Sequence, residues 1–170
     1  MLLRRLCPAL ALLLPHAALA QAAETATGSL TIVQPLTITK DADLRFGSIV
    51  KPSTTGAVAI STTGARSVTD GVQALSAGDT PQAARFTVAG AGGRALSIQI
   101  PPVITLSSGT HALLVTTTSN LTGALAAQVL SGSPETAGSL EVRVGGSVAL
   151  ASTTQPGNYT GVLTVSAAYN

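Results

Sequence analysis

The chain has 170 residues, of which 45% are hydrophobic, 9% are charged and only 2% are aromatic. Its nine lysines and arginines outnumber its seven acidic residues, but Arg4 and Arg5 belong to a leader described below, so the rest of the chain is formally neutral. This balance argues against a nucleic-acid or membrane-surface partner. The only cysteine, Cys7, also lies in the leader, which leaves no thiol for a disulfide, a metal site or catalysis.

Residues 1–20 are predicted to be a secretory signal peptide. Arg4 and Arg5 supply a positively charged start, residues 9–14 an apolar core, and Ala18-Leu19-Ala20 an A-x-A cleavage site. The apolar run is too short to span a bilayer. An uncleaved anchor is the alternative interpretation.

The remainder is expected to divide into an N-terminal extension at 21–33 and a single domain at 34–170. Thr, Ser, Val, Ala and Gly dominate it, and no convincing helical stripe is present. We therefore predict an all-β fold, an Ig-like antiparallel β-sandwich of seven to nine strands. The residues expected in its core are Phe46, Phe86, Ile98, Val142, Leu150, Leu163 and Val165.

Alternating small and apolar residues mark the extension. On one face of an extended segment fall Ala26, Gly28, Leu30 and Ile32, and Pro35 ends the run. Taken alone, this pattern predicts a strand, and its plainest interpretation is the first strand of the domain's own sheet.

The domain is expected to open with a strand that changes its facing pattern. Leu44 and Phe46 share a face, and Gly47 permits a bulge after them. Asp41 and Asp43 suggest a calcium site, but two carboxylates supply too few oxygens for that ion. A solvated turn between strands is the preferred interpretation.

Two hairpins are predicted further along the chain. The glycines at 90, 92 and 93 are expected to form the loop of the first. For residues 139–150 we predict a three-residue loop, Gly145 to Ser147, with Val144 opposite Val148. This register keeps the large apolar side chains on one buried face.

The final stretch, residues 157–170, carries the strongest strand pattern. One face presents Tyr159, Gly161, Leu163, Val165, Ala167 and Tyr169. Because the pattern continues to the last residues, one edge of the final sheet is expected to lack a partner within the molecule.

This stretch resembles the C-terminus of pilin subunits assembled by the chaperone–usher route. Those subunits carry a penultimate tyrosine and a glycine near the fourteenth place from the end; here Tyr169 is penultimate and Gly157 is fourteenth from the end. The extension is similar to a pilin donor strand. The Pro35-Leu-Thr-Ile run, followed by Asp43-Leu-Arg-Phe-Gly, also resembles the opening of a broad, poorly characterised family of secreted, fimbria-like bacterial β-sandwich proteins. Many pilin subunits contain a disulfide, and this chain departs from that pattern.

The resemblance implies a structural subunit of a fimbria or pilus with a role in cell adhesion. Such a subunit is exported to the periplasm, is held by a chaperone, passes an outer-membrane usher and polymerises at the cell surface by donor-strand exchange with copies of itself or related subunits. It would place Gly28 at a constricted pocket of a neighbour's groove and Leu30 and Ile32 in deeper ones, with Ala26 smaller than usual at its pocket. The residues that would pair with the chaperone are Gly157, Tyr159, Gly161, Leu163, Val165, Ala167, Tyr169 and Asn170.

No catalytic or ligand site is predicted. His111 lies in a Thr- and Leu-rich strand without a nearby acid, and neither a nucleophile motif nor paired carboxylates are found. We therefore expect no enzyme activity, cofactor, metal, nucleic acid or small-molecule substrate. The alternative function is a monomeric secreted or surface β-sandwich, or a binding module, although few aromatics are available to stack on a sugar.

Overall fold

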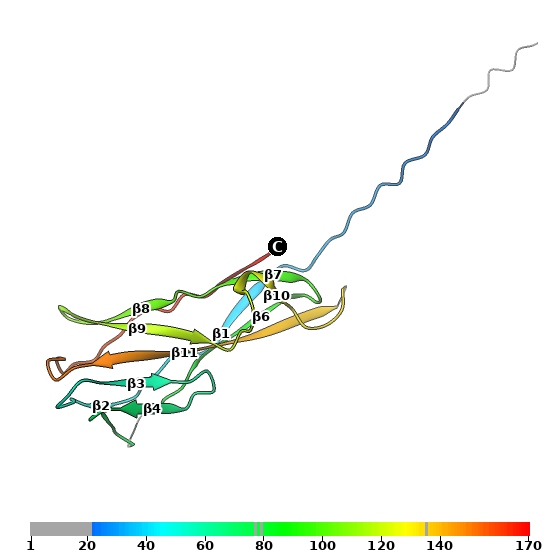
Figure 1. Cartoon of the computed structure of the whole chain (residues 1–170). Coiled ribbons are helices and arrows are strands. Elements are labelled where there is room, and N and C mark those ends of the chain that lie inside the picture. Colours follow the sequence, from blue (N-terminus) through cyan, green and yellow to red (C-terminus); the bar gives the residue numbers. More distant parts are fainter. Residues whose placement is uncertain (1–21, 77, 79, 135) are drawn as a thin grey trace, which may run out of the picture. The chain divides into compact units, whose positions relative to one another are not determined.

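The computed structural model describes residues 22–76, 78, 80–134 and 136–170. The chain divides into two units, Met1–Thr31 and Ile32–Asn170, which are described separately. The predicted signal peptide lies outside the described residues. Residues 22–36 contain no strand or helix, and Ile32–Asn170 form the body of the protein (Figure 1).

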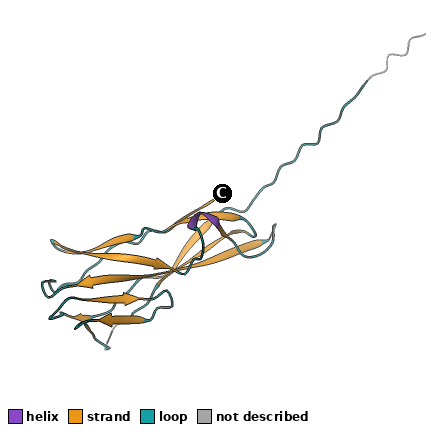
Figure 2. Ribbon diagram, viewed as in Figure 1, coloured by secondary structure: helices purple, strands orange, loops and turns teal. Residues whose placement is uncertain are grey.

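The body is built from antiparallel strands, which confirms the predicted all-β sandwich class (Figure 2). Within the described ranges, the one helical element is a single 3-10 turn, η1 (Leu125–Ala127), and no helix there is long and apolar enough to cross a membrane. The strands are β1 (Thr37–Ala42), β2 (Ile49–Val50), β3 (Gly56–Ile60), β4 (Arg66–Thr69), β5 (Gln73–Ala74), β6 (Ala84–Ala91), β7 (Ala95–Gln99), β8 (Val103–Ser108), β9 (His111–Ser119), β10 (Gln128–Val129), β11 (Ala137–Leu150) and β12 (Ser166–Tyr169).

Most strands belong to one large sheet with the path β1-β6-β11-β3-β4, to which the β8–β9 hairpin is added along β11. A smaller sheet has the order β10-β7-β12, and β2 pairs with β5. The last strand, β12, therefore lies at the edge of its sheet in the described part of the chain. This agrees with the edge position expected for the final stretch.

The longest strand, β11, corrects the prediction of a hairpin at residues 139–150. It runs without a turn for 14 residues, pairing first with β6 and then lying between β9 and β3. A Cβ atom on Gly145 would lie 2.2 Å from the carbonyl oxygen of Ile60, and one on Gly146 would lie 2.7 Å from Val115. The two glycines therefore serve close packing inside a strand and form no loop.

The glycines at 90, 92 and 93 do not close a hairpin either. The strands on the two sides of this segment lie in different sheets, since β6 pairs with β1 and β11, whereas β7 pairs with β10 and β12. The segment is thus a crossover from the large sheet to the small one. That crossover creates the two layers of the sandwich.

The core consists of two clusters of buried apolar residues. The first lies between β6, β7 and β11, and the second is formed by β3, β8, β9 and the end of β11. Four of the predicted core residues, Phe86, Ile98, Val142 and Leu150, are buried as expected. Phe46, Leu163 and Val165 are only half-buried against these clusters. Leu44 and Leu163 each contact both clusters.

Candidate functional site

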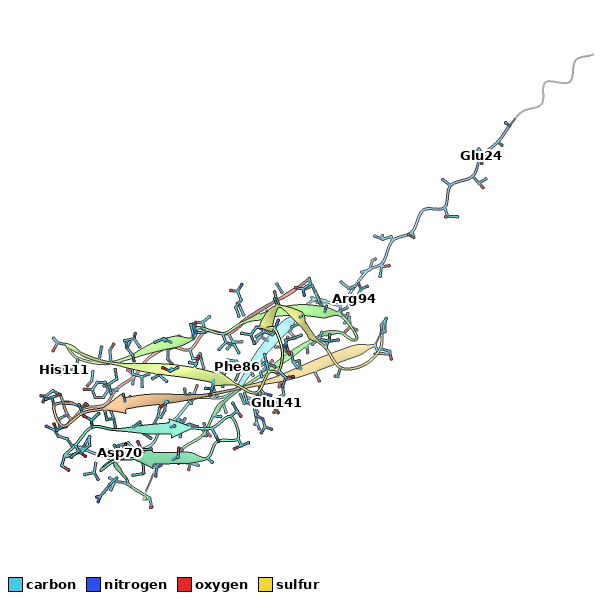
Figure 3. All side chains as sticks on the ribbon, viewed as in Figure 1. Glu24, Asp70, Phe86, Arg94, His111 and Glu141 are labelled. Carbon is cyan, nitrogen blue, oxygen red and sulfur yellow. The ribbon has the colours of Figure 1, made fainter. Side chains whose placement is uncertain are left out.

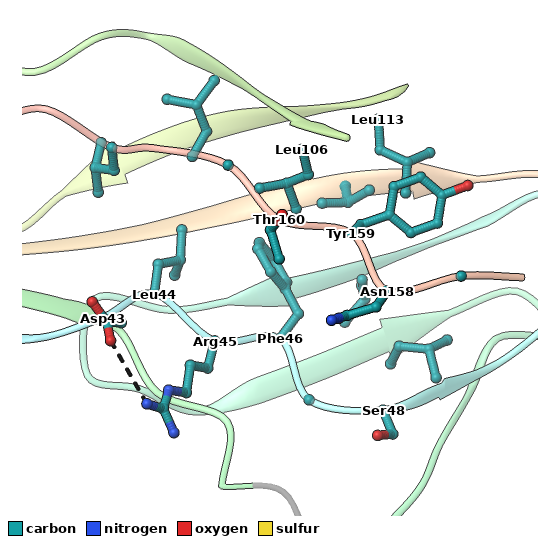
Figure 4. Close-up of a pocket in the computed structure, with 18 of the residues that line it drawn as sticks. Asp43, Leu44, Arg45, Phe46, Ser48, Leu106, Leu113, Asn158, Tyr159 and Thr160 are labelled. Carbon is teal, nitrogen blue, oxygen red and sulfur yellow. Dashed lines mark ion pairs between the residues drawn. The ribbon is translucent and has the colours of Figure 1, made fainter. Parts of the chain in front are cut away.

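The candidate site is a groove of about 860 Å³ in the body, between residues 40–52 and residues 154–163 (Figure 4). We call these two segments the first wall and the second wall. Leu44 and Phe46 project from the first wall toward the second, where Tyr159 and Thr160 lie (Figure 4). The groove opens where Phe46 and Leu163 are half-buried, which explains why these two predicted core residues retain exposed surface.

The first wall forms its hydrogen bonds on the side away from the groove. Arg45 exchanges both backbone hydrogen bonds with Gln82, at N···O distances of 2.9 and 3.0 Å. Because backbone groups alternate in direction along an extended chain, the amide and carbonyl groups of Leu44 point toward the opposite edge. The Arg66 guanidinium holds the end of this wall by donating to the Phe46 carbonyl at 3.2 Å and the Leu75 carbonyl at 2.8 Å.

The second wall is arranged in the same manner. Thr160 exchanges both backbone hydrogen bonds with Ser107 of β8, at 3.0 and 2.7 Å, and further along the Asn170 amide donates to Ala95 at 3.2 Å. The even-numbered residues therefore direct their backbone groups to β8 and β7. By the same alternation, the backbone groups of Tyr159, Gly161 and Leu163 point toward the groove edge.

The floor of the groove is apolar. It is formed by side chains from the large sheet and the β8–β9 hairpin, which are Val58, Phe86, Ile104, Leu106, Leu113, Val148 and Leu150. Two edges with inward-pointing backbone groups above an apolar floor are suited to an extended chain with alternating apolar side chains.

The charged residues that line the groove are three cations, Lys40, Arg45 and Lys51, and one anion, Asp43. Lys40 donates to Asp43 at 2.7 Å, and Arg45 lies 3.6 Å from the same carboxylate. The hydrogen bond and the charge of Lys40 lower the pKa of Asp43 below its ordinary value, with a smaller effect from Arg45. Asp41 accepts a hydrogen bond from the Thr87 hydroxyl at 2.7 Å.

The described residues contain no group of three or more His, Cys, Asp or Glu that could hold a metal ion. Three of the ionisable residues labelled in Figure 3 come from separate elements: Asp70 follows β4, His111 begins β9 and Glu141 lies on β11.

The extension is exposed along its described length. Leu30 is 85% exposed and Ile32 is 87% exposed, and a Cβ atom on Gly28 would meet nothing within 4 Å. The first strand of the body is β1, which begins at Thr37, so residues 22–36 are not a strand of its sheets. Whether the extension serves as the domain's own first strand or as a donor strand stays a prediction.

The C-terminal site residues fall into two groups. Gly157, Tyr159, Gly161 and Leu163 line the groove. Beyond them, Val165, Ala167 and Tyr169 pack against the first core cluster, and the Asn170 side chain donates to the Ala126 carbonyl at 2.8 Å.

Tyr169 has two internal partners that the sequence did not indicate. Its hydroxyl accepts a hydrogen bond from the Ala91 amide at 2.6 Å and donates one to the Gln34 carbonyl at 3.0 Å. Gly90 makes this approach possible, because a Cβ atom there would lie 2.1 Å from the hydroxyl oxygen. Leu106 and Leu113 of the floor were also missed, since apolar strand residues are indistinguishable from ordinary core residues in a sequence.

Comparison with known proteins places the body in a family. Residues 36–169 match the family described as Domain of unknown function (DUF4402). The chain belongs to the DUF4402 family. No curated protein and no solved structure matches the chain. The DUF4402 match begins just after Pro35, so it includes both walls of the groove and excludes the extension.

Proposed function

We propose that this DUF4402 protein is a structural subunit of a bacterial surface fimbria that polymerises by donor-strand exchange. In this proposal, residues 22–33 of one subunit occupy the groove of the next. The observation that carries it is the groove itself, whose two walls form their hydrogen bonds on their outer sides and present backbone groups to the space between them.

The extension has the chemistry that the groove requires. Its alternation places Gly28, Leu30 and Ile32 on one face, which would point to the apolar floor while the backbone pairs with the walls. Burying a leucine or isoleucine side chain stabilises a protein by about 1.5–3 kcal/mol, and Leu30 and Ile32 are both largely exposed in the single chain. Occupying a neighbour's groove would bury both residues and pair the backbone of the extension.

The same site accounts for the proposed partners. A periplasmic chaperone would insert one of its own strands beside residues 159–169 and cover the groove until the usher exchanges it for the extension of another subunit. The protein would then act outside the cell as a non-enzymatic building block. A subunit purified with its chaperone should not bind a free extension until the chaperone is released.

The test is binding of a synthetic peptide of residues 22–33 to a subunit that lacks residues 21–33. The proposal predicts saturable binding with one peptide per subunit and a higher melting temperature, because a ligand that binds only the folded state raises its stability. At a peptide concentration of 100 times Kd, the gain is about 2.7 kcal/mol. Calorimetric titration and thermal unfolding measure the two effects.

Two peptide variants make the test specific. Replacing Leu30 and Ile32 by aspartate changes the face directed to the floor and should abolish binding. Replacing Ser29 and Thr31 by aspartate adds the same charge to the other face and should weaken binding only slightly. Equal behaviour of the two variants, or no binding by the native peptide, would favour a monomeric surface sandwich.

A further inference from the structure

We propose that the Tyr169 hydroxyl, by its hydrogen bonds to Ala91 and Gln34, fixes the chain directly after the extension and thereby sets the stiffness of the joint between neighbouring subunits. We call this pair of hydrogen bonds the clasp. The effect on the joint depends on the proposed function, because it requires the extension to be held by a second subunit. The clasp is a property of the single chain and can be tested separately.

The clasp joins three segments of the body through one oxygen atom. Tyr169 is the last residue of β12, Ala91 is the last residue of β6, and Gln34 precedes β1. The hydroxyl accepts from the Ala91 amide at 2.6 Å and donates to the Gln34 carbonyl at 3.0 Å. A phenolic hydroxyl has one proton to donate and lone pairs to accept, so both bonds are compatible with a single orientation.

The surroundings of the hydroxyl favour this contact. Ala91 is 6% exposed, so its amide would be buried without a partner if the hydroxyl were removed. Gly90 leaves the space for the oxygen, and the Tyr169 ring packs with Leu36 against the first core cluster. The chain is therefore anchored at two nearby points, at Leu36 by packing against the core cluster and at Gln34 by the hydrogen bond from Tyr169.

The position of Gln34 determines how much free chain lies between two neighbouring subunits. Only Val33 separates it from Ile32, the last residue of the alternating face. If the extension of one subunit is bound in a neighbour's groove as far as Ile32, only Val33 remains as free chain between the two subunits. Without the hydroxyl, Gln34 and Pro35 would also become free, and the flexible segment between the subunits would lengthen by up to about 7 Å.

The test uses the exported protein with Tyr169→Phe, which removes the hydroxyl and keeps the ring. Thr117→Val is the matched control, because it likewise removes one hydroxyl, which donates to the Pro101 carbonyl, and neither residue lines the groove. In Tyr169→Phe, the Ala91 amide should exchange with deuterium about tenfold faster. Its polymers should still form but bend more, with a shorter persistence length in electron micrographs. Thr117→Val should match the native protein in both measurements.

The outcomes separate the clasp from the proposed function. Polymers of unchanged stiffness, or unchanged exchange at Ala91, would overturn the inference while leaving donor-strand exchange intact. Absence of polymers from the native protein would overturn the proposed function and, with it, the proposed effect on the joint between subunits. The rate of exchange at the Ala91 amide would then still test the clasp in the single chain.

If Tyr169→Phe does not fold, backbone relaxation of the native monomer decides the question. The clasp predicts that the rigid backbone begins at Gln34. Rigidity that begins only at β1 would overturn it.

Discussion

At the scale of single residues, position in the sequence identified Tyr169, but only the structure shows what it contacts. Its partners Ala91 and Gln34 are 78 and 135 residues away in the chain. No local pattern links them, and Gly90 looks like one of many glycines until the hydroxyl is seen against it. Alternation, by contrast, is a local property, and it correctly placed the side chains of Leu44 and Phe46 on one face.

Gly28 provides a direct test of the extension at this scale. We predict that Gly28→Arg blocks polymerisation, because the side chain would be forced against the groove floor, and leaves the subunit folded, because a Cβ atom there meets nothing within 4 Å. Circular dichroism and size-exclusion chromatography measure the two properties. Ser29→Arg, on the other face, is the control and should still polymerise. Polymers of normal length from Gly28→Arg would contradict the proposed role of this residue.

At the scale of elements, most strands could be predicted from the period-2 pattern, but their connections could not. In β11, the buried side chains of Val142, Val144, Val148 and Leu150 keep one alternation through Gly145 and Gly146. That alternation fits a hairpin with a three-residue loop and an uninterrupted strand equally well. The choice depends on Ile60 and Val115, whose backbone and side chain occupy the space beside the two glycines. These neighbours are distant in sequence.

The continuous strand predicts that Gly145→Ala is destabilising. The added methyl would meet the Ile60 carbonyl oxygen and the Ser61 backbone, which cannot move aside without disturbing β3. We expect a loss of about 1–3 kcal/mol in the free energy of unfolding, as is typical of overpacked positions. Denaturant titration measures it, with Ser147→Ala on the half-exposed side of β11 as a nearly neutral control. A loss below about 0.5 kcal/mol for Gly145→Ala would show that the strand has room at this position.

At the scale of the whole molecule, composition and alternation were sufficient for the β-sandwich class and for much of the core. Composition and alternation could not predict the groove, which only the pilin resemblance implied, because it results from the placement of two distant segments that leave a space between them. Phe46 and Leu163 read as core residues in the sequence. In the structure they border that space and are only half-buried, and the proposed donor strand would cover them.

Site-directed cross-linking tests this central claim most directly, because the only native cysteine, Cys7, lies in the predicted signal peptide. A donor subunit with Ile32→Cys is mixed with an acceptor that lacks residues 21–33 and carries Leu163→Cys in the groove, and a short bismaleimide is added. We predict a covalent heterodimer on a denaturing gel. A matched acceptor with Thr116→Cys, an exposed position on β9 outside the groove, should give none. Equal yields from the two acceptors, or no heterodimer from either, would contradict the account.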